Sequence, residues 1–268
     1  MARPYAEVIG DPIAHSKSPL IHGFWLGRLG IAADYGKTHV RGGDLAALFA
    51  GRRTDPNWRG CNVTVPHKQA VMPYLDALTD DARAIGAVNT IVRNGDRLVG
   101  HNSDAPGFAE ALRNRPAPAQ AVVIGAGGAA RAVLAALKGL GTQRVTILNR
   151  SPDKAAALLA EFGLAGDVRP LDAPLPAADL LANASSLGMT GQPPLDLDLS
   201  PLPAHALVDD IVYAPLETDL LRAARDRGLA TVDGLSMLIG QAAVAFGLFF
   251  GAPPPRAHDA ELRELLTR

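Results

Sequence analysis

Short apolar runs and longer blocks of mixed polarity alternate along the first hundred positions of the chain. Short apolar runs that end at turn residues predict strands over 5–9, 33–38, 59–65, 88–93 and 98–101. Longer blocks of mixed polarity predict helices over 18–29, 44–50, 67–75 and 80–85. The Asn94-Gly95 pair between the last two strands is typical of a hairpin turn. Strands that alternate with helices favour a mainly parallel sheet.

A second part of the chain repeats this alternation after a polar, proline-bearing stretch over 113–118, which separates the two parts. A strand over 121–124 leads through a glycine-rich turn into a helix that ends near residue 140, and a further strand covers 144–148. The alternation continues to Val232. Two segments rich in Pro and Leu are predicted to be loops, 172–176 and 192–203.

The residues from Gly234 to Ala252 form an uncharged run of nineteen, which is the length of a membrane span. Ser236, Gln241 and several glycines dilute its hydropathy, and a helix buried on most sides of an α/β protein has the same composition. We interpret the run as a core helix.

Composition narrows the class of protein and of partner. A length of 268 residues predicts one to two domains. The 26 basic and 27 acidic residues give a net charge of −1, which argues against nucleic acid as the main partner, because phosphate binding needs a basic excess. Cys61 is the single cysteine, so a reducing compartment is expected. The first five residues lack the apolar segment of a secretory signal, and we therefore expect a cytoplasmic protein.

Gly125, Gly127 and Ala130 form a Gly-x-Gly-x-x-Ala pattern directly after a predicted strand and at the start of a predicted helix. A dinucleotide-binding turn requires this context, because the first glycine allows the tight turn and the second lets the backbone approach a pyrophosphate. The free N–H groups at the helix N-terminus would bind the phosphates. Glycine and alanine runs also occur at ordinary strand-to-helix turns, so the pattern alone is weak evidence.

The end of the next strand distinguishes two nicotinamide cofactors. An Asp or Glu at this point would bind the ribose 2′-hydroxyl of NAD, but the chain has Asn149-Arg150-Ser151 there. A neutral residue followed by Arg suits a 2′-phosphate, and Lys154 adds a second positive charge one helical turn later. NADP is therefore the predicted cofactor. The alternative is a solvated helix start with an incidental arginine.

Four polar clusters in the first part are not required by packing. One includes Ser16 and Ser18, although Ser18 is also explained as the N-cap of the following helix. Asn89 enters an otherwise apolar strand, and Asp104 follows a strand end, where it would equally cap the next helix. The seven histidines show no metal-ligand spacing, so no metal site is expected.

The remaining cluster, Cys61–Lys68, contains a candidate proton donor. Strand alternation places Asn62 and Thr64 on one face. Pro66 is predicted to be the first residue of a helix, with Lys68 in its first turn, where the helix dipole disfavours a cation and so favours release of a proton. An ordinary exposed lysine is the alternative.

In order and spacing, these motifs resemble those of the shikimate dehydrogenase family. The segments that carry the resemblance are Ser16-Lys17-Ser18-Pro19, Asn62–Lys68, Gly86–Thr90, Asn102-Ser103-Asp104, Gly125–Ala129, Asn149-Arg150, Asn183–Met189, Asp233-Gly234, Met237-Leu238 and Gln241-Ala242. They span nearly the whole chain, so the resemblance is highly specific.

The resemblance implies a two-domain α/β fold. An N-terminal substrate domain with a mainly parallel sheet would comprise 1–104 and 234–268, and a Rossmann-type NADP-binding domain would comprise 105–233. The implied activity is the reversible NADPH-dependent reduction of 3-dehydroshikimate to shikimate, a step toward the aromatic amino acids. The uncharged 234–252 run would return to the first domain, which removes the membrane interpretation. A monomer or a homodimer is expected.

The same resemblance implies the roles of individual residues. Lys68 and Asp104 would form the catalytic pair, while Ser16 and Ser18 would bind the substrate carboxylate. The other residues implied on the substrate side are Asn62, Thr64, Asn89, Tyr213 and Gln241, with Lys68 and Asp104 also contacting the substrate. The implied cofactor-binding residues are Gly125, Ala126, Gly127, Gly128, Ala129, Asn149, Arg150, Ser151, Lys154, Ser185, Met189, Ile211, Gly234 and Met237.

Two rival hypotheses remain at this point. One is a quinate/shikimate dehydrogenase that uses NAD. Relatives of that kind tend to have an Asp after the second Rossmann strand and often Thr in place of Ser18, so Arg150 and Ser18 argue against it. The other is a non-catalytic nucleotide-binding sensor on the same fold, against which the intact Lys68 and Asp104 argue.

Overall fold

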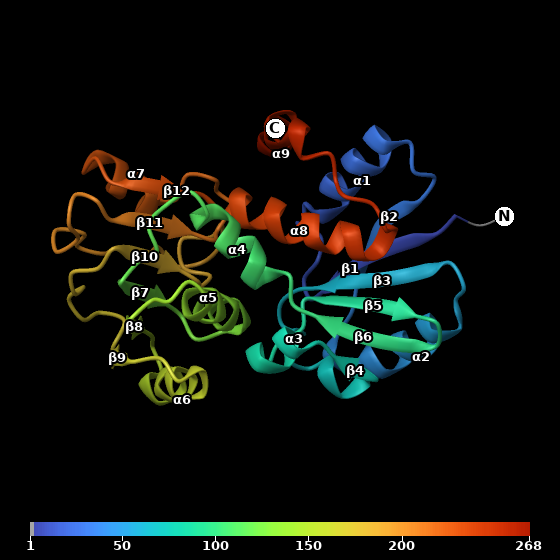
Figure 1. The fold of residues 1–268 in the computed structure, drawn as a ribbon, viewed down its shortest axis with the longest axis horizontal. Coiled ribbons are helices and arrows are strands. Elements are labelled where there is room, and N and C mark those ends of the chain that lie inside the picture. The colour runs from blue at the N-terminus through green and yellow to red at the C-terminus, as the bar shows by residue number, and fades with distance from the viewer. Residues whose placement is uncertain (1–2) are drawn as a thin grey trace. The chain divides into compact units, whose positions relative to one another are not determined.

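The computed structural model describes residues 3–268 and divides into two compact units, each built on its own six-stranded sheet (Figure 1). The first unit contains the described residues up to Ser103 together with Gln241–Arg268, and the second contains Asp104–Gly240. The 113–118 stretch lies inside the second unit, so its prediction as the separator was wrong. The reason is that helix α4 (Asp104–Leu112), which precedes the stretch, already belongs to the second unit.

The sheet of the first unit has the order β2-β1-β3-β5-β6-β4. Its strands are β1 (Tyr5–Gly10), β2 (Asp34–His39), β3 (Trp58–Val63), β4 (Ala77–Leu78), β5 (Thr90–Asn94) and β6 (Arg97–His101). β1 pairs in parallel with β2 and β3, and β4 with β6, whereas β5 runs antiparallel to β3 and β6. The sheet is therefore mainly parallel, as predicted. Gly95, with a φ of 61°, closes the β5–β6 hairpin at the predicted Asn94-Gly95 pair.

One predicted helix of the first unit does not form. The helices are α1 (Ser18–Leu29), α2 (Leu45–Thr54), α3 (Asp80–Ile85), α9 (Asp259–Thr267) and the second part of α8 (Gly234–Phe250), with 3₁₀ turns at Gly42–Asp44, Met72–Tyr74 and Arg256–His258. The helix predicted over 67–75 was wrong, because these residues form successive turns that end in the short 3₁₀ segment. Pro73 lies inside this span, where it removes a backbone donor and disfavours a helical residue before it.

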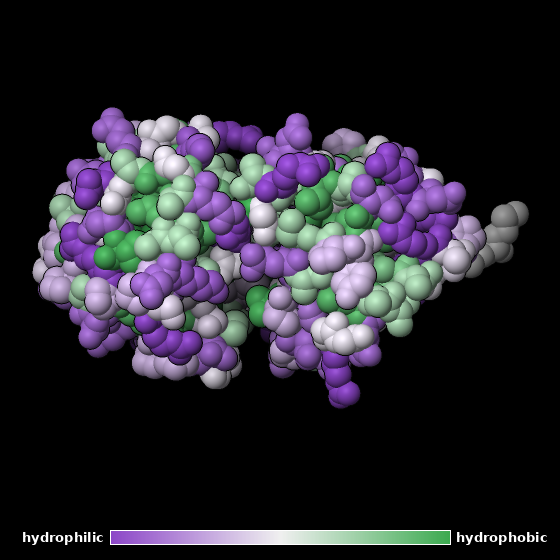
Figure 2. All heavy atoms as spheres, turned by 90° about the horizontal axis from the view of Figure 1, so that it is seen from below, coloured by the Kyte–Doolittle hydropathy of each residue, from purple (hydrophilic) through white to green (hydrophobic). Residues whose placement is uncertain are grey.

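Helix α8 is a core helix, as predicted. Phe249 packs with Ala6, Ala245 and Tyr35, and a Cβ atom on Gly60 would lie 2.8 Å from the Phe249 ring. Gly60 therefore lets the helix approach the sheet closely. Within residues 3–268, no helix is long and apolar enough to cross a membrane. The face shown in Figure 2 carries apolar residues in separate groups among hydrophilic ones.

The sheet of the second unit is entirely parallel and has the order β12-β11-β10-β7-β8-β9. Its strands are β7 (Gln120–Ile124), β8 (Arg144–Leu148), β9 (Gly166–Arg169), β10 (Leu180–Asn183), β11 (Leu207–Asp210) and β12 (Ala230–Val232). Its helices are α4, α5 (Gly128–Gly139), α6 (Pro152–Phe162), α7 (Asp219–Asp226) and the start of α8. Counted from β7, the strand order is 6-5-4-1-2-3, which is the Rossmann arrangement.

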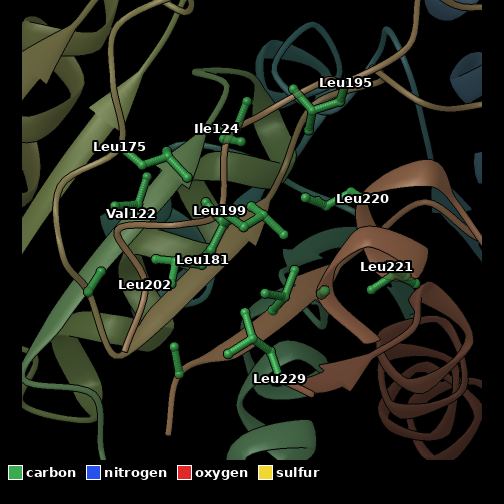
Figure 3. Close-up of a cluster of buried hydrophobic side chains, with 14 of the residues drawn as sticks. Val122, Ile124, Leu175, Leu181, Leu195, Leu199, Leu202, Leu220, Leu221 and Leu229 are labelled. Atoms are coloured by element: carbon green, nitrogen blue, oxygen red, sulfur yellow. The ribbon is translucent and has the colours of Figure 1, made fainter. Parts of the chain in front are cut away.

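Leucines from loops complete the core of this unit. The 172–176 and 192–203 segments are loops, as predicted, and no α-helix connects β10 to β11 in the described chain. Figure 3 shows Leu195, Leu199 and Leu202 of the second loop in one buried cluster with Val122 and Leu181 of the sheet. The loop leucines cover sheet residues that a crossover helix would otherwise cover.

Asp209 is a buried acidic residue of the same sheet. It lies on β11 with 1% of its surface exposed, and neither carboxylate oxygen has a hydrogen-bond partner among residues 3–268. Burial raises its pKa well above the usual value, and the nearby Asp210 and Asp233 act in the same direction, whereas Arg115 lowers it. The folded protein therefore favours the protonated acid.

Replacing Asp209 with Val should stabilise the protein at pH 7 by about 1–3 kcal/mol, the usual cost of a buried unsatisfied polar group. Because the folded pKa exceeds the unfolded value of about 3.9, the native state of the unaltered protein holds this proton after the unfolded chain has released it. Its stability therefore falls as the pH rises from about 4 toward the folded pKa. Thermal unfolding between pH 4 and 7 measures the effect.

The stabilisation by Asp209→Val should be smallest near pH 4 and should grow as the pH rises toward 7. Asp196→Val serves as the control, because Asp196 is an exposed aspartate of the same unit. A difference in Tm between Asp209→Val and the unaltered protein that stays constant with pH would exclude titration of Asp209 as its cause.

Candidate functional site

The glycine-rich turn of the second unit lies where the strand order of the sheet reverses, between β7 and β10. Ligands of such sheets bind outside the carboxyl ends of the strands at this point. Gly125 has a φ of 104°, and a Cβ atom on it would lie 3.1 Å from the carbonyl oxygen of Ala184. Its amide donates to the Leu148 carbonyl at 2.9 Å. The tight turn therefore requires glycine at this position.

Helix α5 begins at Gly128, directly after this turn. Gly127 occupies the N-cap and provides no side-chain cap, and the first turn of the helix contains no acidic residue. The first N–H groups of a helix have no partner within it, and they coincide with the positive end of the helix dipole. Together these features make the helix start suitable for a pyrophosphate.

The Asn149-Arg150-Ser151 segment follows β8, which pairs with β7, so the segment lies at the same edge of the sheet as the glycine turn. Asn149 Nδ2 donates to the Ser151 carbonyl at 2.9 Å and shapes this turn. Arg150 and Lys154 are exposed and form no ion pair with any residue in the described range 3–268. Both cations are therefore available to an anionic ligand.

At the carboxyl end of β10, the buried Asn183 side chain makes hydrogen bonds to two neighbouring side chains. Asn183 Oδ1 accepts from the Ser185 hydroxyl at 2.7 Å, and Asn183 Nδ2 donates to Asp210 Oδ1 at 2.9 Å. Burial raises the pKa of Asp210, although hydrogen bonds from Thr218, Val212 and Asn183 oppose the rise. Ser185 is thus bound within its own loop.

The remaining predicted cofactor residues follow β10 and β11 or begin α8. Met189 is 38% exposed, Ile211 is half-buried and Met237 is buried. A Cβ atom on Gly234 would lie 2.4 Å from the carbonyl oxygens of Ile211 and Val212. Glycine at this position therefore lets α8 begin in direct contact with the end of β11.

In the first unit, the loops after β1 and β3 leave the same edge of the sheet, because these strands are parallel neighbours. The first loop contains Ser16, whose Oγ accepts from the Ser18 amide at 3.3 Å. Ser18 is the first residue of α1 rather than the residue before it, so its predicted role as the N-cap was wrong. Ser16 supplies a hydroxyl acceptor to the helix start instead.

Asn62, near the end of β3, makes hydrogen bonds through both polar atoms of its side-chain amide. Its Nδ2 atom donates to the Asn89 carbonyl at 3.2 Å and to Thr90 Oγ1 at 3.0 Å. Its Oδ1 atom accepts from the Tyr35 hydroxyl at 2.6 Å. The structure thus brings Asn62 and Asn89 together. No sequence motif pointed to Tyr35, since its strand was predicted from apolar pattern alone.

Asn89 belongs to a second buried group of polar side chains. Its Oδ1 atom accepts from the Ser103 amide at 2.7 Å, and its Nδ2 atom donates to Ser103 Oγ at 2.9 Å. The Thr90 hydroxyl donates to Asn89 Oδ1 at 3.1 Å. Thr90 and Ser103 were not identified as site residues, although both lie inside the motifs that contain Asn89 and Asp104.

Lys68 lies on a turn rather than a helix, so the helix-dipole argument for its chemistry was wrong. Its carbonyl accepts from the Val88 amide at 2.7 Å, which joins this turn to the segment before β5. Thr64 is anchored in the same way, because its amide donates to the Ile9 carbonyl at 2.9 Å. Gln241 belongs to this unit and is buried.

The other two predicted substrate-side residues belong to the second unit. Asp104 is the first residue of α4 and is 4% exposed. Tyr213 follows β11, and burial raises the pKa of its hydroxyl. In residues 3–268, no three His, Cys, Asp or Glu side chains are grouped to hold a metal ion.

Family models match three segments of the chain. The model described as the shikimate dehydrogenase substrate binding domain matches residues 8–91. The model described as shikimate / quinate 5-dehydrogenase matches residues 108–187, and the shikimate 5'-dehydrogenase C-terminal domain matches residues 234–261.

Individual relatives cover almost the whole chain. The shikimate dehydrogenase (NADP(+)) of Sphingopyxis alaskensis is 64% identical over 268 residues, which are 99% of this chain and 98% of the relative. A crystal structure of shikimate 5-dehydrogenase from Thermus thermophilus in complex with NADP(H) and shikimate is 39% identical, with a TM-score of 0.88 and coverage of 98% of this chain and 99% of that one.

A quinate dehydrogenase from Corynebacterium glutamicum in complex with NAD is similar in structure as well. It is 32% identical with a TM-score of 0.89, and the match covers 98% of this chain and 99% of that one. Relatives with this fold are therefore found in complex with either nicotinamide cofactor.

Proposed function

Because the chain belongs to the shikimate dehydrogenase family, we propose that Lys68 and Asp104 are the catalytic pair with which it interconverts 3-dehydroshikimate and shikimate. The chain is an oxidoreductase that acts on a CH–OH group and uses NADP. The reaction is a step of the shikimate pathway toward the aromatic amino acids. The single observation that carries the activity is the 64% identity to an NADP-dependent shikimate dehydrogenase over nearly the full length.

The residues at the edge of the second sheet fit NADP. The uncapped start of α5 suits the pyrophosphate, and the exposed Arg150 and Lys154 suit a 2′-phosphate. We propose the same cofactor-binding residues as the motif resemblance implies, with Ser185 acting through the loop that it stabilises. When bound, NADP(H) supplies or accepts the hydride of the reaction.

The chain's own residues must then manage a charge and a proton. Hydride addition to the ketone carbon leaves an alkoxide, which requires a nearby cation and a proton donor. We propose that the Lys68 ammonium stabilises this oxygen and donates the proton to it. The Asp104 carboxylate would orient the ammonium. In the reverse direction the Lys68 amine accepts the proton from the shikimate hydroxyl.

The buried polar side chains of the first unit suit a hydroxylated ring better than an apolar one. We propose that Ser16 and Ser18 bind the substrate carboxylate, and that the ring hydroxyls and the carbonyl are bound by the remaining substrate-side residues, Asn62, Thr64, Asn89, Asp104, Tyr213 and Gln241. A site built to bond hydroxyl groups rejects analogues that lack them, because its polar groups would be left unpaired.

A nicotinamide absorbance assay with purified protein tests the proposal. We expect NADP-dependent oxidation of shikimate with a kcat/KM at least about tenfold above that for quinate or for NAD with shikimate. Higher activity with quinate and NAD would favour the quinate/shikimate dehydrogenase alternative, and NADP binding without turnover of either substrate would favour the non-catalytic sensor.

Location and assembly are also proposed. The single cysteine, Cys61, is buried and free, which suits a reducing compartment, and we propose a cytoplasmic enzyme. We propose a monomer or a homodimer, which sedimentation at assay concentration distinguishes.

A further inference from the structure

Tyr35 contacts Asn62, one of the predicted substrate-binding residues, through its hydroxyl. It lies on β2, and β2 and β3 pair with opposite sides of β1. Tyr35 pairs in register with Ala6, whose small side chain packs in the same buried cluster and leaves room for the ring. The Tyr35 hydroxyl reaches Asn62 Oδ1 at 2.6 Å.

The hydrogen bonds of Asn62 allow a single orientation of its amide. The Asn89 carbonyl can accept but not donate, so the amide atom that faces it at 3.2 Å must be Nδ2. The second Nδ2 hydrogen is used by Thr90 Oγ1 at 3.0 Å. Oδ1 therefore faces Tyr35, whose hydroxyl must be the donor. Asn62 has one lone pair on Oδ1 left for a ligand, and no donor hydrogen.

The Tyr35 ring is held in place by its neighbours. It stacks on His22 with a centroid distance of 3.9 Å and an interplanar angle of 1°. His22 is completely buried, and burial lowers its pKa to about 3, so the stacked imidazole is neutral near pH 7. Phe249 of α8 lies 6.3 Å from the Tyr35 ring, between centroids. The hydroxyl thus occupies a fixed place beside Asn62.

Ser18 contacts the same phenol. Burial raises the pKa of Tyr35 well above its usual value of 10, and Cys61 and Glu7 act in the same direction, whereas a side-chain hydrogen bond with Ser18 lowers it. Tyr35 therefore stays protonated. Its proton is directed at Asn62 Oδ1.

We propose that Tyr35 is a positioning residue that presents Asn62 to the substrate as a hydrogen-bond acceptor, and so selects a substrate with a hydroxyl group at the position that Asn62 contacts. A carbonyl oxygen at that position would meet an acceptor and be rejected, and a ring carbon without a hydroxyl would leave Oδ1 with an unused lone pair. The inference rests on the proposed function, in which Asn62 binds shikimate.

Tyr35→Phe is the direct test, because it removes the hydroxyl and keeps the ring that stacks on His22. We expect the KM for shikimate to rise about three- to tenfold, which corresponds to the loss of the hydrogen bond that holds Asn62. The kcat and the KM for NADP should change by less than about twofold, because a positioning residue of the substrate half should not affect the cofactor. Thermal unfolding of each variant accompanies the kinetics.

Tyr5→Phe provides a matched control in the same unit. The Tyr5 hydroxyl donates to Asp55 Oδ2 at 2.7 Å, so this variant also removes a hydrogen-bonded tyrosine hydroxyl and keeps the ring. Tyr5 is not among the proposed site residues, and its loss should leave the KM for shikimate unchanged. Equal effects of Tyr35→Phe and Tyr5→Phe on that constant would overturn the positioning role while the proposed function stands.

Substrate analogues test the acceptor role without any substitution. For one of the two analogues, 4-deoxyshikimate or 5-deoxyshikimate, the unaltered enzyme should have a KM about tenfold or more above that for shikimate. The ratio of this KM to the KM for shikimate should fall by about threefold or more in Tyr35→Phe, and it should not change in Tyr5→Phe. Equal use of both analogues and shikimate by the unaltered enzyme would overturn the inference, and no oxidation of shikimate itself would overturn the proposed function as well.

Discussion

Replacing Lys68 with Ala should lower kcat for shikimate oxidation by about 10²- to 10⁴-fold, which is the usual contribution of a positioned acid–base group. The KM for shikimate should change far less, because the charge on the oxygen develops fully only in the transition state. The turn that contains Lys68 is fixed by its own backbone, through the bond from the Val88 amide to the Lys68 carbonyl at 2.7 Å. Truncating the side chain should therefore leave the turn intact. Saturation kinetics at neutral pH measure both constants.

Lys68→Arg separates proton transfer from simple charge. Arginine keeps the positive charge but does not release its proton in proteins. If Lys68 donates and accepts a proton, the Arg variant should be nearly as slow as the Ala variant. Recovery of most of the activity in Lys68→Arg would show that a fixed cation is sufficient and would exclude the proton-transfer role.

Asp104 provides a further control on the same group. Asp104→Ala should also lower kcat. If both residues act as one unit, the double variant should lose much less kcat than the product of the two single fold-losses predicts. Losses that multiply would show that the two side chains act independently.

Replacing Arg150 with Ala should raise the KM for NADP by about 10- to 150-fold, which corresponds to about 1.5–3 kcal/mol for hydrogen bonds to a charged group. The KM for NAD should hardly change, since NAD lacks the 2′-phosphate that Arg150 is proposed to bind. The effect should decrease as salt is added, because Arg150 is exposed and its interaction with an anion is screened. Measuring the KM for NADP and for NAD at two salt concentrations tests both the cofactor preference and its screening.

Arg227→Ala is the matched control for Arg150. Arg227 is an exposed arginine of the same unit, but it lies just before β12 and so at the amino edge of the parallel sheet. Its removal should leave the KM for both cofactors unchanged. If Arg150→Ala weakens NADP and NAD by the same factor, Arg150 supports the fold and does not discriminate the phosphate.

The first elements of the second unit were predictable because each depends on local sequence. The apolar run at β7, the glycines after it and the helix that follows are consecutive in the chain, and their combination specifies one supersecondary structure. The segment over 67–75 shows the opposite case. Its polarity pattern is helical, but a single proline overrides the pattern, and the residues form turns.

The contacts of the first unit depend on residues that are distant in the sequence. Glu7 is 3% exposed, although its strand was predicted without any buried charge. It accepts from Arg52 Nε at 2.7 Å and from Trp58 Nε1 at 2.8 Å, and neither partner is near it in the sequence. The partners of Asn62 are equally distant. Sequence motifs therefore identified Asn62, but not the hydrogen bonds that decide which of its atoms meets a ligand.

The discontinuity of the first unit has a consequence for biosynthesis. Asp104–Gly240 is one continuous segment, so the second unit has all its strands once residue 240 has been synthesised. The first unit needs Gln241–Arg268, because Phe246 and Phe249 of α8 cover His22, Trp25 and Tyr35. Domains generally fold as units during synthesis. We therefore expect the middle of the chain to complete its fold first during synthesis, while the earlier-made sheet keeps an exposed aromatic face until Gln241–Arg268 packs on it.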